Sequence, residues 1–285
     1  MEKQTILFIS DMRQVKLAEI LIKQGKQVRC LDVRGENETA EQLEKLKEFL
    51  PDTDTLVFPI PISKIANQNI LNDILMKDVE KNTAVLGGCF SKEQLQIFEQ
   101  RGICYHDFMK DTIVQQENAI ATAEGTIANI IVNSPYNIEN AKILVCGYGN
   151  CGKVVAEKLK NLGARVTVLA RRKISRREAK KDGFYAVDFA FGPEEAMGAA
   201  AIVNTVPAPV VSKYMIQELP KDAYIIDIAS IPGGTDFVFA KECGVKAELV
   251  LGIPGKYAPK ESAYILSRSM ERFERKRRAQ RKNID

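Results

Sequence analysis

Short apolar runs of strand length alternate with stretches of helical period along nearly the whole chain. In the first part, a capping-box pattern of Ser91 and Gln94 marks the start of one helix. The pattern predicts strands at 5–10, 27–33, 56–60, 83–88 and 104–108, and helices at 12–24, 39–50 and from 91 onward. Strands that alternate with helices are typical of parallel sheets with crossover connections, so this part is expected to be α/β.

A second series of the same kind begins at Lys142, with strands predicted at 142–146, 165–170, 184–187, 201–205, 224–229 and 246–250. Two helices at 111–119 and 122–133 are expected to meet near Ala121, and a last helix runs from about 261 to 278. At roughly 150 residues per domain, a chain of 285 residues is expected to form two Rossmann-like domains with parallel sheets. We place the N-terminal domain at 1–121 and a dinucleotide-binding domain at 122–261.

The segment Gly147-Tyr148-Gly149-Asn150-Cys151-Gly152 carries the strongest chemical signal in the chain. It follows an apolar strand and opens a helical stretch at 153–162, which Gly163 ends before a second strand. In that context Gly147 permits the tight turn, Gly149 lets the backbone approach a pyrophosphate, and Gly152 lets helix and strand pack closely. The helix N-terminus then offers N–H groups to the phosphates. The alternative is a glycine-rich turn without a ligand.

Residues Ala170-Arg171-Arg172, at the end of the second strand, bear on the choice between NAD and NADP. An acidic residue about 20 positions after the glycines would bind the ribose 2′-hydroxyl of NAD. No carboxylate is present there, and two arginines can pair with a 2′-phosphate. We therefore expect NADP as the cofactor, with a surface basic cluster as the alternative.

Two loops after later strands are candidates for the rest of the site, because ligands of such sheets lie at the carboxyl ends of the strands. The first, Asn204-Thr205-Val206-Pro207, suits a loop along the nicotinamide ribose, or it is a proline-rich turn. The second runs from Asp227 through Ser230 to Gly233-Gly234-Thr235-Asp236, and its paired glycines allow close backbone approach to a ring. Asp227 could instead be a buried structural acid, and Asp236 is either a helix N-cap or a catalytic group.

Three further candidates lie outside these loops. Lys260, in a turn-rich link before the last helix, could act on the substrate by holding a carboxylate, or it is a solvated lysine. Thr122 and Glu124 fit a helix start with Thr122 as its cap, or they bind substrate from a domain cleft. His106, the only histidine, could serve as acid or base, but a structural role is favoured.

Charge, hydropathy and cysteine content bear on nucleic-acid binding, membrane insertion, cellular compartment and metal binding. The formal net charge is +4, and many cations lie between Arg268 and Lys282, where a solvated helix face is favoured over a nucleic-acid tail. No apolar run reaches the roughly 18–20 residues of a membrane helix, and the N-terminus leads into a strand rather than a signal peptide. The six cysteines form no C-x-x-C pair, which indicates reduced thiols in the cytoplasm and no metal site.

Together these segments resemble the A-subunit family of dipicolinate synthase over about residues 100–270. The run Pro232-Gly233-Gly234-Thr235-Asp236-Phe237 is the specific part, with Gly252-Ile253-Pro254-Gly255 and Ala258-Pro259-Lys260 after it. The resemblance also includes 121–127, the glycine turn at Gly147, and 204–207. It is weaker before residue 100, where Asp11-Met12-Arg13-Gln14 is similar to the first β-α turn of the family.

The resemblance implies oxidation of a dihydrodipicolinate-level intermediate to dipicolinate during sporulation, with NADP as hydride acceptor. It implies a small dicarboxylate substrate, a partner in the flavoprotein-like B subunit of dipicolinate synthase, and a fold similar to the D-2-hydroxyacid dehydrogenases. In that fold the C-terminal helix, here 262–285, completes the N-terminal domain. We also expect a homo-oligomer. The candidates for binding the carboxylates are Lys260, Thr235 and the backbone N–H groups near Gly233 and Gly234.

Three positions depart from the family pattern. Ile231 stands where an arginine is expected, Ala121 replaces a proline, and Ser10 replaces a glycine. The loss of a cation at Ile231 bears on the binding of a dianionic substrate, so another NADP-dependent dehydrogenase of the same fold is one alternative. A non-catalytic NADP-binding regulatory subunit is a second alternative, because no clear acid–base pair is evident.

Overall fold

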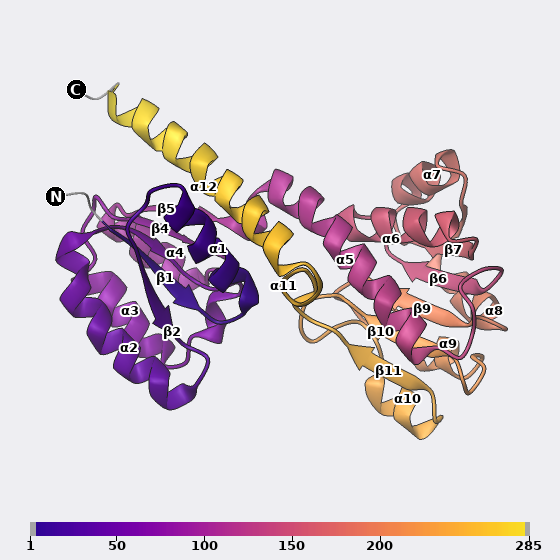
Figure 1. Ribbon diagram of the computed structural model, residues 1–285. Coiled ribbons are helices and arrows are strands. Elements are labelled where there is room, and N and C mark those ends of the chain that lie inside the picture. The colour runs from indigo at the N-terminus through magenta and orange to yellow at the C-terminus, as the bar shows by residue number, and fades with distance from the viewer. Residues whose placement is uncertain (1–3, 283–285) are drawn as a thin grey trace. The chain divides into compact units, whose positions relative to one another are not determined.

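The computed structural model describes residues 4–282, and the chain divides into two compact units (Figure 1). Unit 1 comprises Met1–Glu117 together with Ala258–Asp285, and unit 2 comprises Asn118–Tyr257. Each unit contains one parallel sheet, so the predicted α/β class with two parallel-sheet domains is confirmed. Both divisions of the chain come a few residues earlier than the expected limits of 121 and 261.

The sheet of unit 1 has the strand order β2-β1-β3-β4-β5, and every neighbouring pair is parallel. Along β1, Ile6 and Phe8 pack on one face with α2, α3 and α4, whereas Leu7 and Ile9 pack on the other face with α1 and α12. Burial of both faces is typical of a parallel sheet. The elements are β1 (Gln4–Ile9), α1 (Met12–Lys23), β2 (Val28–Asp32), α2 (Glu36–Phe49), η1 (Leu50–Asp52), β3 (Thr53–Val57), η2 (Ile62–Lys64), α3 (Gln68–Lys77), β4 (Ala84–Gly87), α4 (Lys92–Arg101), β5 (Cys104–Asp107), η3 (Phe108–Lys110) and α12 (Pro259–Lys282).

The sheet of unit 2 is also parallel, with the order β11-β10-β9-β6-β7-β8. Its two faces form separate cores: Ile143 and Val145 pack with α5, α6 and α7, whereas Leu144 and Cys146 pack with α8, α9 and α10. The elements are α5 (Thr112–Asn133), which the division at 117 crosses, β6 (Lys142–Cys146), α6 (Asn150–Asn161), β7 (Arg165–Leu169), α7 (Lys173–Lys181), β8 (Tyr185–Val187), η4 (Phe189–Phe191), α8 (Gly192–Ala196), β9 (Ala201–Asn204), α9 (Lys213–Ile216), β10 (Tyr224–Asp227), α10 (Phe237–Glu242), β11 (Lys246–Leu249) and α11 (Ile253–Tyr257).

The prediction of two helices meeting near Ala121 is wrong, because α5 runs without interruption from Thr112 to Asn133. Thr122 is therefore not an N-cap: its hydroxyl donates to the carbonyl of Asn118 at 2.8 Å, one turn earlier. Threonine hydroxyls that bond back along a helix occupy its interior rather than its end. Ala121 and Ala123 are buried along the same helix, and neither breaks it.

Several other element boundaries differ from those predicted from the sequence, and one predicted helix start agrees. Strand β3 begins at Thr53, three residues before the predicted run at 56. Thr53 is fully buried, and its hydroxyl donates to the carbonyl of Phe49 at 2.7 Å, so a polar residue extends the strand beyond its apolar run. Helices α3, α7, α8, α9 and α11 were not expected from the pattern. In contrast, the Ser91–Gln94 capping box is confirmed, since each side chain accepts from the backbone of the other residue.

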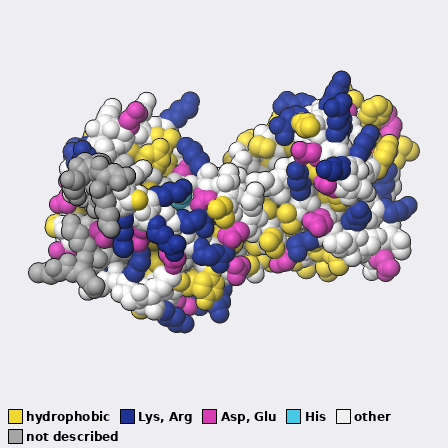
Figure 2. Space-filling view, turned by 90° about the horizontal axis from the view of Figure 1, so that it is seen from above, with side chains coloured by type: hydrophobic (Ala, Val, Ile, Leu, Met, Phe, Trp, Pro, Cys, Tyr) yellow, Lys and Arg dark blue, Asp and Glu magenta, His cyan; other side chains and the backbone are white. Residues whose placement is uncertain are grey.

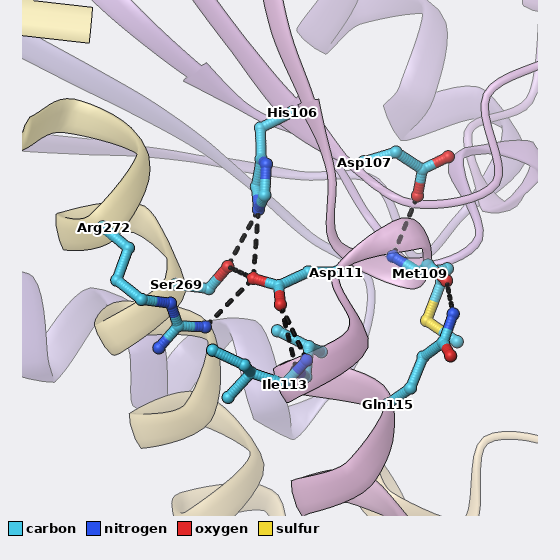
Figure 3. A network of polar contacts seen from close by, with 9 residues as sticks. His106, Asp107, Met109, Asp111, Ile113, Gln115, Ser269 and Arg272 are labelled. Carbon is cyan, nitrogen blue, oxygen red and sulfur yellow. Dashed lines mark hydrogen bonds and ion pairs between the residues drawn. The ribbon is translucent and has the colours of Figure 1, made fainter. Parts of the chain in front are cut away.

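Within unit 1, a polar network around Asp111 connects helix α12 to the segment between β5 and α5 (Figure 3). The Ser269 hydroxyl donates to Asp111 at 2.7 Å, the Arg272 guanidinium donates to Asp111 at 3.0 Å, and His106 Nε2 lies 2.8 Å from the Ser269 oxygen. Despite burial, which raises it, these contacts lower the pKa of Asp111 to about 2. Ser269 is fully buried and stands between the histidine and the carboxylate, so this group is a structural clamp rather than a nucleophilic triad.

Because His106 belongs to this network, we expect its protonation to make the free energy of unfolding depend on pH in the acidic range. Burial lowers the pKa of His106 in the folded chain, so the unfolded chain takes up this proton first as the pH falls through about 6.5. The contribution of His106 to stability is therefore present above that pH and is lost on acidification, by up to about 1.4 kcal/mol per pH unit. Urea unfolding at pH 7.5 and 5.5 measures it.

The matched variant is His106→Gln, which removes the only imidazole. The advantage in stability of the parent chain over His106→Gln is expected to shrink from pH 7.5 to pH 5.5. A constant difference between the two proteins across this range would contradict the assignment. Asp111 titrates far below it and does not contribute there.

Charged side chains of both signs are spread over the surface. On the face shown in Figure 2, Lys and Arg are scattered over both units, with Asp, Glu and hydrophobic side chains among them. Several arginines of α12 form ion pairs, namely Arg268 with Glu117, Arg272 with Asp111, Arg275 with Glu271 and Arg278 with Glu274. Over residues 4–282, no helix is long and apolar enough to cross a membrane, and no cluster of His, Cys, Asp and Glu is placed to hold a metal.

Candidate functional site

The strand order of unit 2 fixes where a ligand is expected. Numbered from β6 as the first strand, the order is 3-2-1-4-5-6 read from β8, which is that of dinucleotide-binding domains. The connections reverse direction between β6 and β9, and ligands of such sheets bind outside the carboxyl ends of the strands at this point. The turn after β6 and the loop after β9 flank it, and β9 pairs directly with β6 from Ile143 to Cys146.

The turn between β6 and α6 has the geometry that a pyrophosphate requires. Gly147 has φ +97°, a conformation that favours glycine. A Cβ on Gly152 would lie 2.3 Å from the carbonyl oxygen of Gly147, so α6 begins in close contact with the turn. A Cβ on Gly149 would meet nothing within 4 Å. The backbone at Gly149 is therefore open to an approaching group, and the helix N-terminus behind it offers N–H donors.

Replacement of Gly149 and of Gly152 by alanine is expected to have different effects, the first on dinucleotide binding and the second on stability. Gly149→Ala is expected to fold with unchanged stability, because space is open and φ is −94°, but to weaken dinucleotide binding about tenfold or more. Gly152→Ala forces the turn apart, since the obstructing atom is backbone, and is expected to cost about 1–3 kcal/mol of stability. Thermal unfolding and cofactor titration of both variants separate the two effects. Equal loss of stability in both would contradict the geometry.

Side chains near the turn serve mainly to hold it. The Thr205 hydroxyl and backbone N–H both donate to the carbonyl of Cys146, at 2.8 and 2.9 Å. Tyr148 is buried, and its hydroxyl donates to Asp182 at 2.7 Å, so its ring supports the turn from the core rather than facing a ligand. Burial raises the pKa of Cys151, while a hydrogen bond with Thr122 opposes this change. Thr122 therefore lies beside the first turn of α6.

The loop after β7 presents the residues that were expected to choose the cofactor. Ala170 is buried, whereas Arg171 and Arg172 are exposed. Arg176 shapes this loop, because its guanidinium donates to the carbonyls of Ala170 and Arg171, both at 2.6 Å, and pairs with Asp188 at 2.5 Å. Sequence reasoning missed Arg176, since nothing distinguishes it from the basic residues around it.

A buried carboxylate organises the two loops after β9 and β10. Asp227 is fully buried, and its Oδ2 accepts from Asn204 Nδ2 at 2.9 Å, from the N–H of Gly234 at 2.7 Å and from the Thr235 hydroxyl at 2.8 Å. Its Oδ1 accepts from the N–H of Ala229 at 3.0 Å. Asp227 is thus the structural acid that the sequence left as one of its alternatives.

This network corrects the expected carboxylate-binding donors. The N–H of Gly234 and the hydroxyl of Thr235 already donate to Asp227, and the N–H of Gly233 donates to the carbonyl of Ser230 at 2.8 Å. These three donors are therefore occupied within the protein. Gly234 is required for packing, because a Cβ there would lie 2.1 Å from the carbonyl oxygen of Ala208.

In the loop 204–207, polar side-chain groups are likewise hydrogen-bonded within the protein. Asn204 is fully buried, donates to the carbonyl of Val206 at 3.0 Å and accepts from the N–H of Val206 at 3.0 Å. Its amide therefore fixes the start of the loop that leads to Pro207. The side chain of Val206 lies against Gly147, since a Cβ on Gly147 would come within 2.8 Å of it. The loop thus lies beside the glycine turn, as a loop flanking a bound dinucleotide must.

The other candidate residues lie in different surroundings. Asp236 caps α10, because its carboxylate accepts from the N–H of Phe239 at 3.0 Å. Ser230 and Ile231 are exposed after β10, Ile231 at 73%. Glu124 is exposed on α5 and pairs with Lys158 of α6 at 3.0 Å. Lys260 lies in the first turn of α12 and belongs to unit 1, whereas the other candidates belong to unit 2.

Comparisons with known proteins agree with this division. Residues 10–109 match the model of the N-terminal domain of the dipicolinate synthase A subunit. Residues 118–250 match the model of the NAD binding domain of S-adenosyl-L-homocysteine hydrolase. The second match supports a nicotinamide dinucleotide as the cofactor of unit 2 and, with it, an oxidoreductase in general.

Individual relatives point the same way. The chain is 32% identical to the dipicolinate synthase A subunit of Bacillus subtilis (strain 168) over 156 residues, which are 55% of this chain and about half of that protein, 52%. The crystal structure of the dipicolinate synthase A subunit from Bacillus halodurans has a TM-score of 0.79 at 25% identity, covering 95% of this chain and 97% of that one. A transhydrogenase structure from Sinorhizobium meliloti shares the fold, with a TM-score of 0.65 at 13% identity and coverage of 92% and 90%. The chain is therefore similar to the A subunit of dipicolinate synthase, in its N-terminal domain by the family model and in its whole fold by the solved structure.

Proposed function

We propose that this protein is an NADP-dependent oxidoreductase that converts a dihydrodipicolinate-level intermediate to dipicolinate. The similarity to the A subunit of dipicolinate synthase supports the reaction, and the loop after β7 supports the choice of cofactor. In that loop, Arg171 and Arg172 are exposed where a carboxylate would select NAD. This exposed arginine pair is the observation that carries the proposal for NADP.

In the proposed reaction, the ring of the substrate loses a hydride and a proton and becomes aromatic. The dinucleotide supplies the hydride acceptor when it is bound. Aromatisation is strongly downhill, so the chain has mainly to place the ring carbon and hold the two carboxylates. Within unit 2, the glycine turn holds the phosphates, and the Asp227 network fixes the loops that flank the ring. Ser230 and Lys260 are exposed and remain candidates for contacts with the substrate.

The proposal extends to the setting of the reaction. We propose a cytoplasmic protein that acts in sporulation together with the flavoprotein-like B subunit of dipicolinate synthase, and that forms a homo-oligomer. Similarity to proteins that are named as one subunit of a synthase supports the presence of a second, different subunit.

A cofactor titration tests the proposal directly. NADPH and NADH are titrated separately into the protein, and binding is followed by the fluorescence of the reduced nicotinamide. We expect tighter binding of NADPH, and tighter binding of NADH would overturn the choice of NADP. Oxidation of freshly prepared dihydrodipicolinate is then assayed with NADP, in the presence and absence of the B subunit, and is compared with reduction of 2-oxo acids.

A second candidate is another dehydrogenase of the same fold, and Ile231 favours it. This residue is exposed in the loop after β10, at a position where the resemblance to the family leads us to expect an arginine. With isoleucine in place of arginine, this position offers no positive charge to a carboxylate of a dianionic substrate. Reduction of a 2-oxo acid, without oxidation of dihydrodipicolinate, would identify this candidate as the function.

A further inference from the structure

Unit 1 has a ligand-binding geometry of its own. Its strand order, β2-β1-β3-β4-β5, reverses direction between β1 and β3. In open parallel sheets this reversal marks the crevice in which ligands bind, at the carboxyl ends of the two strands. The segment after β1 enters α1 through Ser10 and Asp11, and the segment after β3 leads through Ile60 to η2.

Charged side chains from both segments converge at this crevice. Arg13 is almost completely buried, and its guanidinium donates to Asp11 at 3.3 Å and across to the carbonyl of Ile60 at 3.1 Å. From the other side, Lys64 donates to the same carboxylate of Asp11 at 2.6 Å. Two cations therefore meet one anion, which leaves these three side chains with a net positive charge at the carboxyl ends of β1 and β3.

Two donors of this cluster have no acceptor among the residues that the structure describes. Arg13 Nε and Gln14 Nε2 are buried and form no hydrogen bond. The oxygen of the Gln14 amide accepts from the N–H of Asp11 at 3.0 Å, which holds the amide against the first turn of α1. Buried donors without a partner are costly, and both are of the kind that an oxyanion satisfies.

We propose that this cluster binds a carboxylate group of a small acidic substrate. Arg13 and Gln14 would supply the inner donors, Lys64 the outer charge, and the N-terminus of α1 a favourable dipole. A carboxylate fits better than a phosphate, because Asp11 stands within the cluster and repels a second negative charge more strongly than a first. The identity of the ligand as a dicarboxylate rests on the proposed function, whereas the carboxylate class follows from the cluster.

Two substitutions test the site without removing the buried Arg13. Lys64→Gln removes the outer charge from a side chain that is one third exposed. Gln14→Glu keeps the oxygen that caps α1 but replaces the free donor by a negatively charged acceptor. Lys77→Gln is the matched control, since Lys77 forms an ion pair with Asp73 at 3.2 Å on the exposed face of α3.

Binding of pyridine-2,6-dicarboxylate to the full chain, saturated with NADP, is measured by calorimetry. We expect Lys64→Gln and Gln14→Glu each to weaken it about tenfold or more, with Lys77→Gln and NADP affinity unchanged. Thermal unfolding confirms that each variant is folded. Parental affinity in both site variants would overturn the site while leaving the proposed function intact.

Further probes separate failure of the site from failure of the proposed function. If pyruvate binds in place of the dicarboxylate and depends on Lys64 and Gln14, the site stands and the proposed function fails. Equal binding of inorganic phosphate would overturn the carboxylate assignment. The absence of binding by any of these anions would overturn the site itself.

Discussion

Replacement of Asp227 by alanine is expected to lower the free energy of unfolding by about 3–5 kcal/mol, among the largest effects of any single change in unit 2. The carboxylate is fully buried and accepts four hydrogen bonds, from Asn204, Ala229, Gly234 and Thr235. Truncation leaves these donors buried without an acceptor, which costs more than the net value of the bonds. Urea unfolding followed by circular dichroism measures the change.

Asp236→Ala is the matched control, nine residues further along the same loop and helix. Its carboxylate forms one hydrogen bond, to the N–H of Phe239, and stands at an exposed helix start. Loss of a cap of this kind costs about 1 kcal/mol. If the two alanine variants were equally stable, the Asp227 network would not organise the loops as described.

Asp227→Asn adds a sharper comparison, because it keeps the shape but replaces one acceptor oxygen by a donor. That donor would face either the N–H of Ala229 or the three donors around Oδ2. We expect an intermediate loss of stability together with weaker binding of the dinucleotide, since the displaced loops flank the cofactor crevice. Cofactor titration by nicotinamide fluorescence reports this second effect.

The glycine turn was predictable because its physical requirements are local. Gly147, Gly149 and Gly152 lie within six residues, and the contact that excludes a side chain at Gly152 is made by Gly147 itself. A pattern of neighbouring residues therefore contains the whole constraint. The same holds for the Ser91–Gln94 capping box, whose two hydrogen bonds close within one helical turn.

The role of the loop 227–235 was not predictable, because its determinants are distant in the chain. Asn204 is far from Asp227 in sequence, and only the pairing of β9 with β10 brings their side chains together. Without that register, Gly234 and Thr235 resemble free donors for a ligand. In the folded chain they complete a buried network, so the residues matter for a different reason.

Local pattern gave a wrong prediction for α5, and it gave no sign of the charged cluster at the first β-α turn. Thr122 followed by Glu124 has the composition of a helix start, but burial of Ala121 and Ala123 continues the helix through it. The cluster of Asp11, Arg13 and Lys64 joins residues more than fifty positions apart, and it forms only because β3 lies beside β1. Tertiary packing thus decides both cases.

Replacement of both Arg171 and Arg172 by alanine is expected to weaken NADP binding about tenfold to a hundredfold and to change NAD binding little. Both side chains are exposed after β7, where the ribose of a bound dinucleotide is expected. Only NADP carries a 2′-phosphate at that ribose, and charge-assisted hydrogen bonds to it are worth about 1.5–3 kcal/mol each. Loss of the two arginines therefore removes binding energy from one cofactor and not from the other.

The matched control is Lys180→Ala with Lys181→Ala, which removes the same two charges from the last turn of α7. If general electrostatic attraction were responsible, the two double variants would weaken the binding of each cofactor to the same extent, and the effect would vanish at high salt. A specific contact predicts a loss that is confined to NADP and to the arginine variant. The two models thus differ in the ratio of NADP to NAD affinity, which titration of all three proteins with both cofactors measures without reference to the substrate.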